Sequence, residues 1–238
     1  MTLKITAVMP AYNVEKLIGR TVERIPQNSI HELVIINDGS KDGTGRVASQ
    51  IKRDGIEVKF IDFEKNRGYG AVQKAGFNAA LEGGADVVVL LHSDGQYAPE
   101  LLPKLLKPFY KEKADVVQGS RMLGGGALKG GMPLYKYLGN RFLTAIENIA
   151  YGMDMAEYHS GYMLYSRRAL ESIPFMKLSD TFHFDGEMLM MAGKKKLKIE
   201  EIPIPTKYAE EKSNLKSLQY GIDVLKIVYK YLKGGYDF

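Results

Sequence analysis

The chain has 238 residues, of which 45% are hydrophobic and 26% charged, a composition typical of a globular protein and not of a disordered one. Its formal net charge of +5 favours anionic partners, such as nucleotides or phosphorylated lipids. Cysteine is absent, which excludes disulfides and thiolate metal sites and is compatible with a reducing cytoplasm.

Short apolar runs rich in β-branched residues predict seven strands, with helical patterns between them. The expected strands are residues 4–9, 33–36, 58–61, 87–91, 114–117, 161–165 and 198–202. The expected helices are 15–25, 43–53, 68–82, 99–111, 134–151, 167–172, a helix starting at Asp185, and 215–232. Strands and helices that alternate with short connections predict an α/β fold with a mostly parallel sheet. No apolar run is long enough to predict a membrane-spanning helix.

A cluster of potential metal ligands follows the most apolar strand. His92-Ser93-Asp94-Gly95-Gln96 comes directly after residues 87–91, and ligands bind at the carboxyl ends of strands in parallel sheets. On a continuing strand His92 and Asp94 would share a face, and Gln96 could join them after the turn at Gly95. An imidazole, a carboxylate and an amide oxygen can hold Mn²⁺ or Mg²⁺. The alternative is a turn that only caps the next helix.

Two other expected strand ends carry polar residues. Pro10-Ala11-Tyr12-Asn13 follows the first strand, Glu15 opens the helix after it, and this is where the base and ribose of a nucleotide would lie. The second strand ends in Asn37-Asp38-Gly39-Ser40, where Asp38 can accept hydrogen bonds from a base or ribose; the same composition is also common in turns.

A third glycine-containing segment, Asn66-Arg67-Gly68-Tyr69-Gly70, lacks the third glycine of a dinucleotide fingerprint and does not follow the first strand. We therefore reject a dinucleotide-binding site.

The second half of the chain is less regular. Residues 122–133 hold five glycines and are expected to form a mobile loop. The aromatic-rich helix at 134–151 is either a core helix or a helix that touches lipid. The basic amphipathic helix at 215–232 either packs on its own domain or lies on a membrane. We expect residues 1–210 to form one domain and 211–238 to form this C-terminal helix.

Five ordered motifs together resemble the inverting family 2 glycosyltransferases of the GT-A fold, in the branch similar to dolichol-phosphate mannosyltransferases. They are Pro-Ala-Tyr-Asn-x-Glu at 10–15, Asn-Asp-Gly-Ser-x-Asp-Gly-Thr at 37–44, Asn-x-Gly-x-Gly at 66–70, the Asp94 region, and Gly-Ser-Arg at 119–121. The resemblance covers residues 4–207. It implies a GT-A fold, a nucleotide-sugar donor, and a divalent cation, Mn²⁺ or Mg²⁺.

The resemblance also implies roles for individual residues. Nucleotide contacts would come from the first three of these motifs and from the cluster at 92–96. The residues are Pro10, Ala11, Tyr12, Asn13, Glu15, Asp38, Gly68, Gly70 and Ser93. The family's Asp-x-Asp element falls on His92-Ser93-Asp94, so His92 replaces the first acidic residue, while Asp94 and Gln96 match metal-associated positions.

On the acceptor side, Asp185 and Glu187 resemble the family's acidic motif, and Arg121 is a candidate helper for the departing diphosphate. A hydroxyl acceptor would need Asp185 as a base, whereas a lipid phosphate is already anionic. Related mannosyltransferases have a basic Gly-x-Ser-Lys segment after the last strand. This chain keeps Lys212 and Ser213 at best and has acidic residues at 210 and 211.

These features predict a glycosyltransferase that moves a hexose from a GDP- or UDP-sugar to a polyprenyl phosphate, in the cytoplasm and at the cytoplasmic face of a membrane. One alternative is the same donor chemistry with a hydroxyl acceptor on a saccharide or small molecule. A second is a non-catalytic module that binds nucleotide sugars, suggested by His92. A sugar-nucleotide nucleotidyltransferase would need a glycine-rich basic loop after the first strand, which is absent. We expect no nucleic-acid partner, and the sequence does not indicate an oligomeric state.

Overall fold

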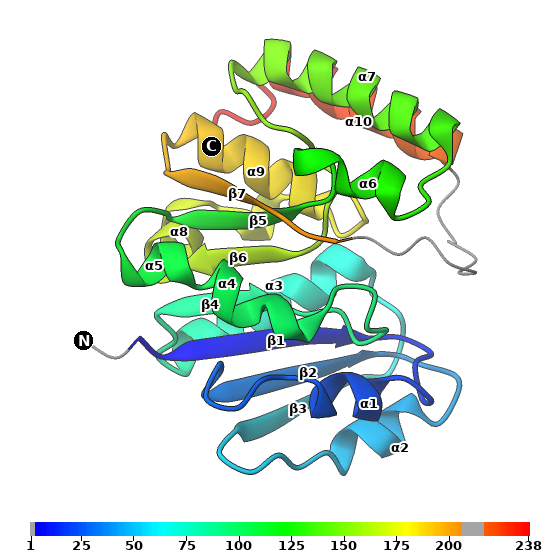
Figure 1. Cartoon of the computed structure of the whole chain (residues 1–238), viewed down its shortest axis with the longest axis vertical. Coiled ribbons are helices and arrows are strands. Elements are labelled where there is room, and N and C mark those ends of the chain that lie inside the picture. Colours follow the sequence, from blue (N-terminus) through cyan, green and yellow to red (C-terminus); the bar gives the residue numbers. More distant parts are fainter. Residues whose placement is uncertain (1–2, 206–216) are drawn as a thin grey trace. The chain divides into compact units, whose positions relative to one another are not determined.

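The computed structural model describes residues 3–205 and 217–238. Seven strands form a sheet in the order β3-β2-β1-β4-β6-β5-β7 (Figure 1). The strands are β1 (Ile5–Ala11), β2 (Glu32–Asp38), β3 (Glu57–Phe63), β4 (Val87–Leu90), β5 (Val116–Ser120), β6 (Met163–Ser166) and β7 (Ile199–Pro203). Strands β3, β2, β1 and β4 are parallel, whereas β6 runs antiparallel to both β4 and β5. The predicted α/β fold with a mostly parallel sheet is confirmed.

The chain divides into two compact units. The first contains Met1–Gln118 and Gly161–Glu200, and the second contains Gly119–Ser160 and Glu201–Phe238. The helices of the first unit are α1 (Ile18–Glu23), α2 (Thr44–Ser49), α3 (Tyr69–Glu82), α4 (Leu102–Leu105), α5 (Lys107–Tyr110), α8 (Arg167–Ser172) and α9 (Phe184–Lys194). Those of the second are α6 (Gly126–Lys129), α7 (Leu134–Tyr151) and α10 (Ser217–Leu232). The predicted domain boundary at 210/211 lies outside the described residues and stays a prediction.

Two expectations about local structure are wrong for identifiable reasons. The single helix expected at 99–111 is divided between α4 and α5, because Pro103 and Pro108 each stand in the first turn of a short helix, where a missing N–H costs nothing. The glycine-rich segment 122–133 is not a loop without secondary structure. It contains a 3₁₀ turn (Leu123–Gly125) and α6, and its apolar side chains form a small buried cluster: Met122, Ala127 and Met132, against Tyr137 and Ala156.

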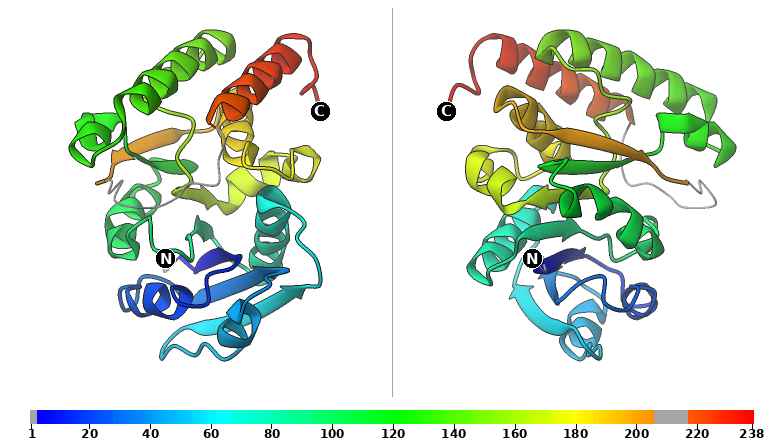
Figure 2. Two further views of the ribbon diagram at one scale, coloured as in Figure 1. Left: turned by 90° about the vertical axis from the view of Figure 1, so that its right-hand side faces the viewer. Right: turned by 60° about the vertical axis from the view of Figure 1, so that its left-hand side comes forward.

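The structure bears on one of the two alternatives for residues 134–151, the core helix. Only Thr144 and Glu147 of α7 are buried, so the helix does not have the burial of a core helix. Helix α10 lies beside α7 in every view (Figures 1 and 2). In the part of the chain that the structure describes, no helix combines the length and apolar character needed to cross a membrane.

The central strands of the first unit are covered closely by α3. Residues Ile5–Met9 of β1 are completely buried, and α3 contacts both β1 and β2. Gly76 permits this approach, because a Cβ there would collide with Val8 Cγ1 and lie 3.1 Å from Ile36 Cδ1. The absence of a side chain at one helical position therefore sets the distance between helix and sheet.

We predict that Gly76→Ala lowers the free energy of unfolding by about 1–3 kcal/mol, because overpacking outweighs the gain in helix propensity. Gly19→Ala is the matched control: Gly19 is also helical, and a Cβ there meets nothing within 4 Å. It should raise the free energy of unfolding by about 0.5–1 kcal/mol. Urea denaturation measures both values, and equal effects of the two substitutions would contradict the packing argument.

Candidate functional site

The predicted nucleotide residues of the first unit are brought to one edge of the sheet. Because β1, β2 and β4 are parallel neighbours, their carboxyl ends lie together, and these ends carry the segments beginning at Pro10, Asp38 and Leu91. Direct contacts join the segments: Ser93 Oγ donates to Pro10 O at 2.7 Å, and Asn13 N donates to Ser40 Oγ at 3.0 Å. The three loops are therefore tied to one another.

The loop after β1 is held in a fixed conformation by the loop after β2. Asn13 has a positive φ of 53°, and its Oδ1 accepts the N–H of Lys41 at 2.9 Å. Glu15 accepts the N–H of Gly43 at 3.2 Å and pairs with Arg46. Tyr12, by contrast, leaves 44% of its surface exposed. The polar neighbours thus fix the backbone, and the Tyr12 ring is accessible to a ligand.

Asp38 is buried and receives backbone N–H groups. Its two carboxylate oxygens accept the N–H groups of Arg67 at 2.7 Å and Gly68 at 3.2 Å, which connects the end of β2 to the start of α3. A Cβ at Gly68 or Gly70 would collide with the backbone carbonyls of Asp180 or Ser179. In this structure the two glycines therefore admit a segment of the protein itself.

The cluster at 92–96 does not continue a strand. Strand β4 ends at Leu90, one residue before the expected end. The continuing strand on which His92 and Asp94 would share a face is therefore not formed, and the residues lie on an irregular turn. Gly95 has a φ of 73°, and Asp94 Oδ1 accepts the N–H of Gln96 at 3.0 Å. The conformation of the turn is set by the positive φ of Gly95 and by the bond from the Gln96 N–H to the Asp94 side chain, and not by the pleat of a strand.

His92 begins a chain of hydrogen bonds that ends at Asp185. Its Nε2 lies 3.2 Å from Gly161 O and 3.0 Å from Tyr69 Oη, and Tyr69 Oη donates to Asp185 Oδ2 at 2.9 Å. A carbonyl oxygen can only accept, so Nε2 carries a proton. Gln73 Nε2 donates to the other oxygen of Asp185 at 3.0 Å.

The environment of Asp185 gives it an unusual acidity. Burial raises the pKa of its carboxyl to about 6, while the hydrogen bonds from Gln73 and Tyr69 limit the rise. Burial also raises the pKa of Tyr69 well above its ordinary value, so its hydroxyl remains a donor. A carboxyl with a pKa near 6 can hold or release a proton close to neutral pH. The arrangement can serve acid–base chemistry or position a polar ligand.

Glu187, the second acidic residue predicted near the acceptor, holds the loop before α9. The side chain is buried, and Oε2 accepts the N–H of Ser179 at 2.7 Å. Glu187 thus shapes the segment that packs against Gly68 and Gly70.

The residues on the 92–96 turn carry oxygen and nitrogen atoms of the kinds that can bind a divalent cation. Among residues 3–205 and 217–238, no group of three or more acidic or histidine side chains is arranged to hold a metal ion. Mg²⁺ is commonly bound by one or two carboxylates, with substrate phosphates and water completing its octahedron. Asp94 with Gln96 fits that type of site, and His92 could add a ligand only through Nδ1 while Nε2 keeps its hydrogen bonds. The metal-ligand assignments stay predictions.

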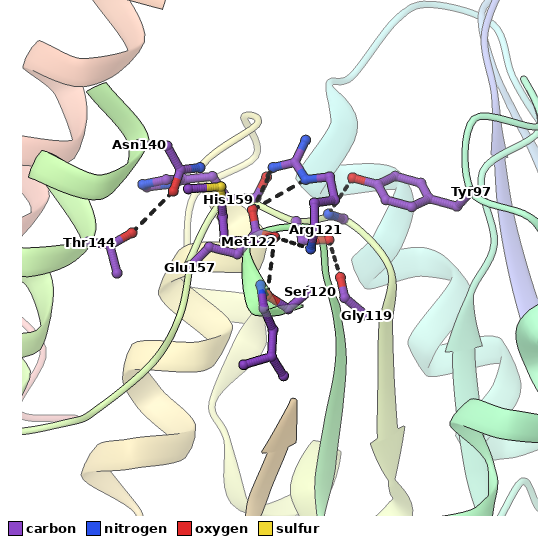
Figure 3. Close-up of polar contacts among 12 residues, drawn as sticks. Tyr97, Gly119, Ser120, Arg121, Met122, Asn140, Thr144, Glu157 and His159 are labelled. Carbon is purple, nitrogen blue, oxygen red and sulfur yellow. Dashed lines mark hydrogen bonds and ion pairs between the residues drawn. The ribbon is translucent and has the colours of Figure 1, made fainter. Parts of the chain in front are cut away.

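Arg121, in the second unit, is engaged by a buried carboxylate (Figure 3). Its Nε and Nη2 donate to Glu157 Oε2 at 3.2 and 2.7 Å, and Nη2 also donates to His159 O at 2.5 Å. Glu157 is fully buried. Burial favours its protonated form, but the Arg121 charge and hydrogen bonds outweigh this and hold the pKa of Glu157 below its usual range. Arg121 thus neutralises an internal charge, and its predicted role toward the departing diphosphate stays a prediction.

Two residues at the site were not identified from the sequence. Tyr69 and Gln73 both contact Asp185, and both come from α3, four residues apart on one helix face. The spacing is visible in the sequence, but Asp185 lies more than 100 residues further along the chain. The predicted Lys212 and Ser213 fall outside the described residues.

Comparisons with known proteins give a consistent result. The model of glycosyl transferase family 2 matches residues 6–173. A UDP-N-acetylglucosamine–dolichyl-phosphate N-acetylglucosaminyltransferase of Methanococcus voltae is 31% identical, over 94% of this chain and 93% of its own. A polyprenol monophosphomannose synthase of Mycolicibacterium smegmatis is 28% identical, over 85% of this chain and 77% of its own.

The fold also matches solved structures. Glucosyl-3-phosphoglycerate synthase from Mycobacterium tuberculosis, in complex with Mn²⁺, uridine diphosphate and glucosyl-3-phosphoglycerate, superimposes with a TM-score of 0.68. The match covers 98% of this chain and 80% of that one at 19% identity, so it supports the GT-A fold alone.

We predict that Arg121→Met lowers the free energy of unfolding by about 3–5 kcal/mol, because it leaves the Glu157 carboxylate buried and unpaired. Thermal and urea unfolding measure the loss. Arg20→Met, at an exposed arginine on α1, is the matched control and should change stability by less than about 0.5 kcal/mol. An Arg121→Met protein as stable as the control would show that the ion pair is not important for folding.

Proposed function

The chain belongs to glycosyl transferase family 2, and on this premise we propose that it transfers a hexose from a nucleotide sugar to a polyprenyl phosphate with inversion at the sugar carbon. The protein is a glycosyltransferase. The observation that carries the acceptor class is the near full-length similarity to relatives named for polyprenyl- or dolichyl-phosphate acceptors. Those relatives carry different sugars in their names, so the similarity supports the acceptor more strongly than the sugar.

The proposed reaction is a single displacement. A phosphate oxygen of the lipid attacks the anomeric carbon, the bond from that carbon to the diphosphate breaks, and the nucleoside diphosphate leaves. No proton has to be removed from an ionised phosphate. In this reaction Asp185, held by Tyr69 and Gln73, positions a hydroxyl of the sugar and does not act as a base.

For the donor, we assign the diphosphate side to the turn at 92–96. Asp94 and Gln96 would hold Mn²⁺ or Mg²⁺, with His92 Nδ1 as a further ligand. The cation would offset the charge that develops on the leaving diphosphate. Tyr12, whose ring is exposed beside the fixed loops, would contact the base, and Asp38 would form part of the same nucleotide subsite.

A second candidate function keeps the donor chemistry but uses a hydroxyl acceptor. The pKa of Asp185, raised by burial to about 6, is the observation that favours it, because such a carboxylate can take a proton from an attacking hydroxyl near neutral pH. In both cases we place the reaction in the cytoplasm, with a lipid acceptor reached at the cytoplasmic face of the membrane.

The test is an assay with radiolabelled UDP- and GDP-sugars, a short polyprenyl phosphate in detergent, and Mn²⁺ or Mg²⁺. We expect an organic-extractable product that requires the cation, and Asp94→Asn should reduce its formation at least about 100-fold. Asp54→Asn, at an exposed carboxylate in a different loop, is the control and should retain activity. Transfer only to saccharide hydroxyls would favour the second candidate. Binding of donors without turnover under any condition would support a non-catalytic module.

The pH dependence tests whether the ionised form of Asp185 takes part in the reaction. Because its pKa is raised to about 6, its carboxylate forms as the pH rises through 6, and kcat/KM should increase over that range. Tyr69→Phe removes a bond that favours the carboxylate, so the increase should move to higher pH. The acceptor phosphate also titrates, but its pKa is the same for both proteins. Superimposable profiles for wild type and Tyr69→Phe would exclude a role for the ionised Asp185.

A further inference from the structure

Helix α7 of the second unit is amphipathic with its polar side inward. Its two buried residues are Thr144 and Glu147, and Glu147 Oε2 lies 3.1 Å from His159 Nε2. The opposite face exposes large apolar side chains. Successive members are three, four and seven residues apart, a helical spacing that keeps them on one face: Tyr135, Leu138, Phe142 and Ile149, with Leu134 beside them. Ile149 is 85% exposed. A helix in a water-exposed protein normally has the reverse arrangement.

Helix α10 exposes a second apolar stripe. Five large side chains separated by four and three residues are exposed along its whole length: Leu218, Ile222, Leu225, Tyr229 and Leu232. Leu218 at the start of the stripe is 81% exposed. Val224 and Val228, which lie on another side of the helix, are buried. The helix therefore has a conventional inner face and an additional apolar face that nothing in the described chain covers.

The two stripes lie on neighbouring helices. A Cβ at Gly221 of α10 would be 3.6 Å from Leu143 of α7, and the rings of Tyr151 and Tyr231 are 4.8 Å apart. Early residues of α10 thus meet the middle of α7, and the ends of both helices meet, so the helices run in the same direction side by side (Figure 2). Ten large apolar side chains are exposed on these two adjacent helices, which is more than the scattered hydrophobic residues of an ordinary protein surface explain.

The charges beside the α10 stripe are mainly positive. Lys226, Lys230 and Lys233 each follow an exposed apolar residue of the stripe by one position, and their spacing of four and three places them along one flank. Lys226 pairs with Asp223, and Lys230 lies over the Tyr236 ring. Lysines beside an apolar face, with tyrosine in the stripe, are typical of helices that lie in a lipid interface, where the lysines reach anionic head groups.

We propose that the exposed faces of α7 and α10 form a docking surface that lies in the interface of an anionic lipid bilayer. The inference rests on the proposed function, because a polyprenyl phosphate acceptor resides in a membrane. The exposed side chains of α7 and α10 that support it are observed independently of the candidate active site. A second copy of the chain fits less well, because a two-fold interface brings the same surface together, including the lysine flank of α10.

The test is co-sedimentation of the full chain with vesicles, without donor or acceptor. One set contains phosphatidylcholine alone, and the other contains phosphatidylcholine with phosphatidylglycerol. We expect stronger binding to the second set. Leu138→Gln/Phe142→Gln/Ile149→Gln should weaken binding to it at least about tenfold, because three apolar side chains that enter the interface are lost. Lys226→Gln/Lys230→Gln/Lys233→Gln should weaken it by about tenfold or more, and only on anionic vesicles.

The control is Tyr110→Gln, which removes an exposed aromatic residue of α5 in the first unit and should leave binding unchanged. Circular dichroism and thermal unfolding should show that every variant is folded, since all the substituted side chains are exposed or flank the stripe. Equal vesicle binding by wild type and the α7 variant would overturn the proposal. A wild-type dimer in sedimentation velocity that the same variant converts to a monomer would also overturn it, in favour of an interface between copies.

Activity assays separate this inference from the proposed function. With a short polyprenyl phosphate dispersed in detergent, the α7 variant should transfer sugar at the wild-type rate. With the acceptor embedded in anionic vesicles, its rate should fall in parallel with its binding. If wild type binds vesicles as expected but forms no lipid-linked product in either format, the docking surface stands and the proposed acceptor fails.

Discussion

The parallel pairing of β1 with β2 and β4 is the constraint on which the candidate site depends. It places the carboxyl ends of three strands at one edge, so residues from Pro10 to Gln96 come together although the chain between them forms three crossovers. Side-chain bonds to backbone then fix the loops: Asn13 joins the first to the second, and Ser93 joins the third to the first. The same polar residues that are candidates for ligand binding therefore make the hydrogen bonds that hold the loops at this edge of the sheet together.

Asp185 shows how burial and hydrogen bonding act against each other at this edge. Desolvation raises its pKa, and Tyr69 and Gln73 restrain the rise, so the carboxyl titrates near 6. His92 Nε2 lies 3.0 Å from Tyr69 Oη and therefore connects the turn proposed to bind the diphosphate with the carboxyl proposed to contact the sugar. An ionised aspartate at position 92 could not donate a hydrogen bond to the carbonyl oxygen of Gly161, as His92 Nε2 does. The histidine thus has a physical role here beyond replacing an acidic metal ligand.

The second unit buries ion pairs beside its apolar clusters and also exposes large apolar side chains. The Arg121–Glu157 pair and the Glu147–His159 contact are buried, while leucine, isoleucine and aromatic side chains of α7 and α10 are exposed. Buried ion pairs need partners in the fold, and exposed apolar faces need partners outside it. The exposed faces of α7 and α10 therefore form a surface suited to a less polar environment than water.

The amino-acid sequence by itself determined the seven strands, the sheet class, the bounds of α7 and α8, and the family, because apolar periodicity and ordered motifs are local properties. It did not determine that β4 stops at Leu90, that Arg121 neutralises Glu157, or that Tyr69 and Gln73 hold Asp185. Nor could the sequence decide which face of α7 is buried. An amphipathic pattern shows that a helix has an apolar face, but it does not show what that face contacts. Only the tertiary structure decided these points, because each depends on contacts between residues distant in the chain.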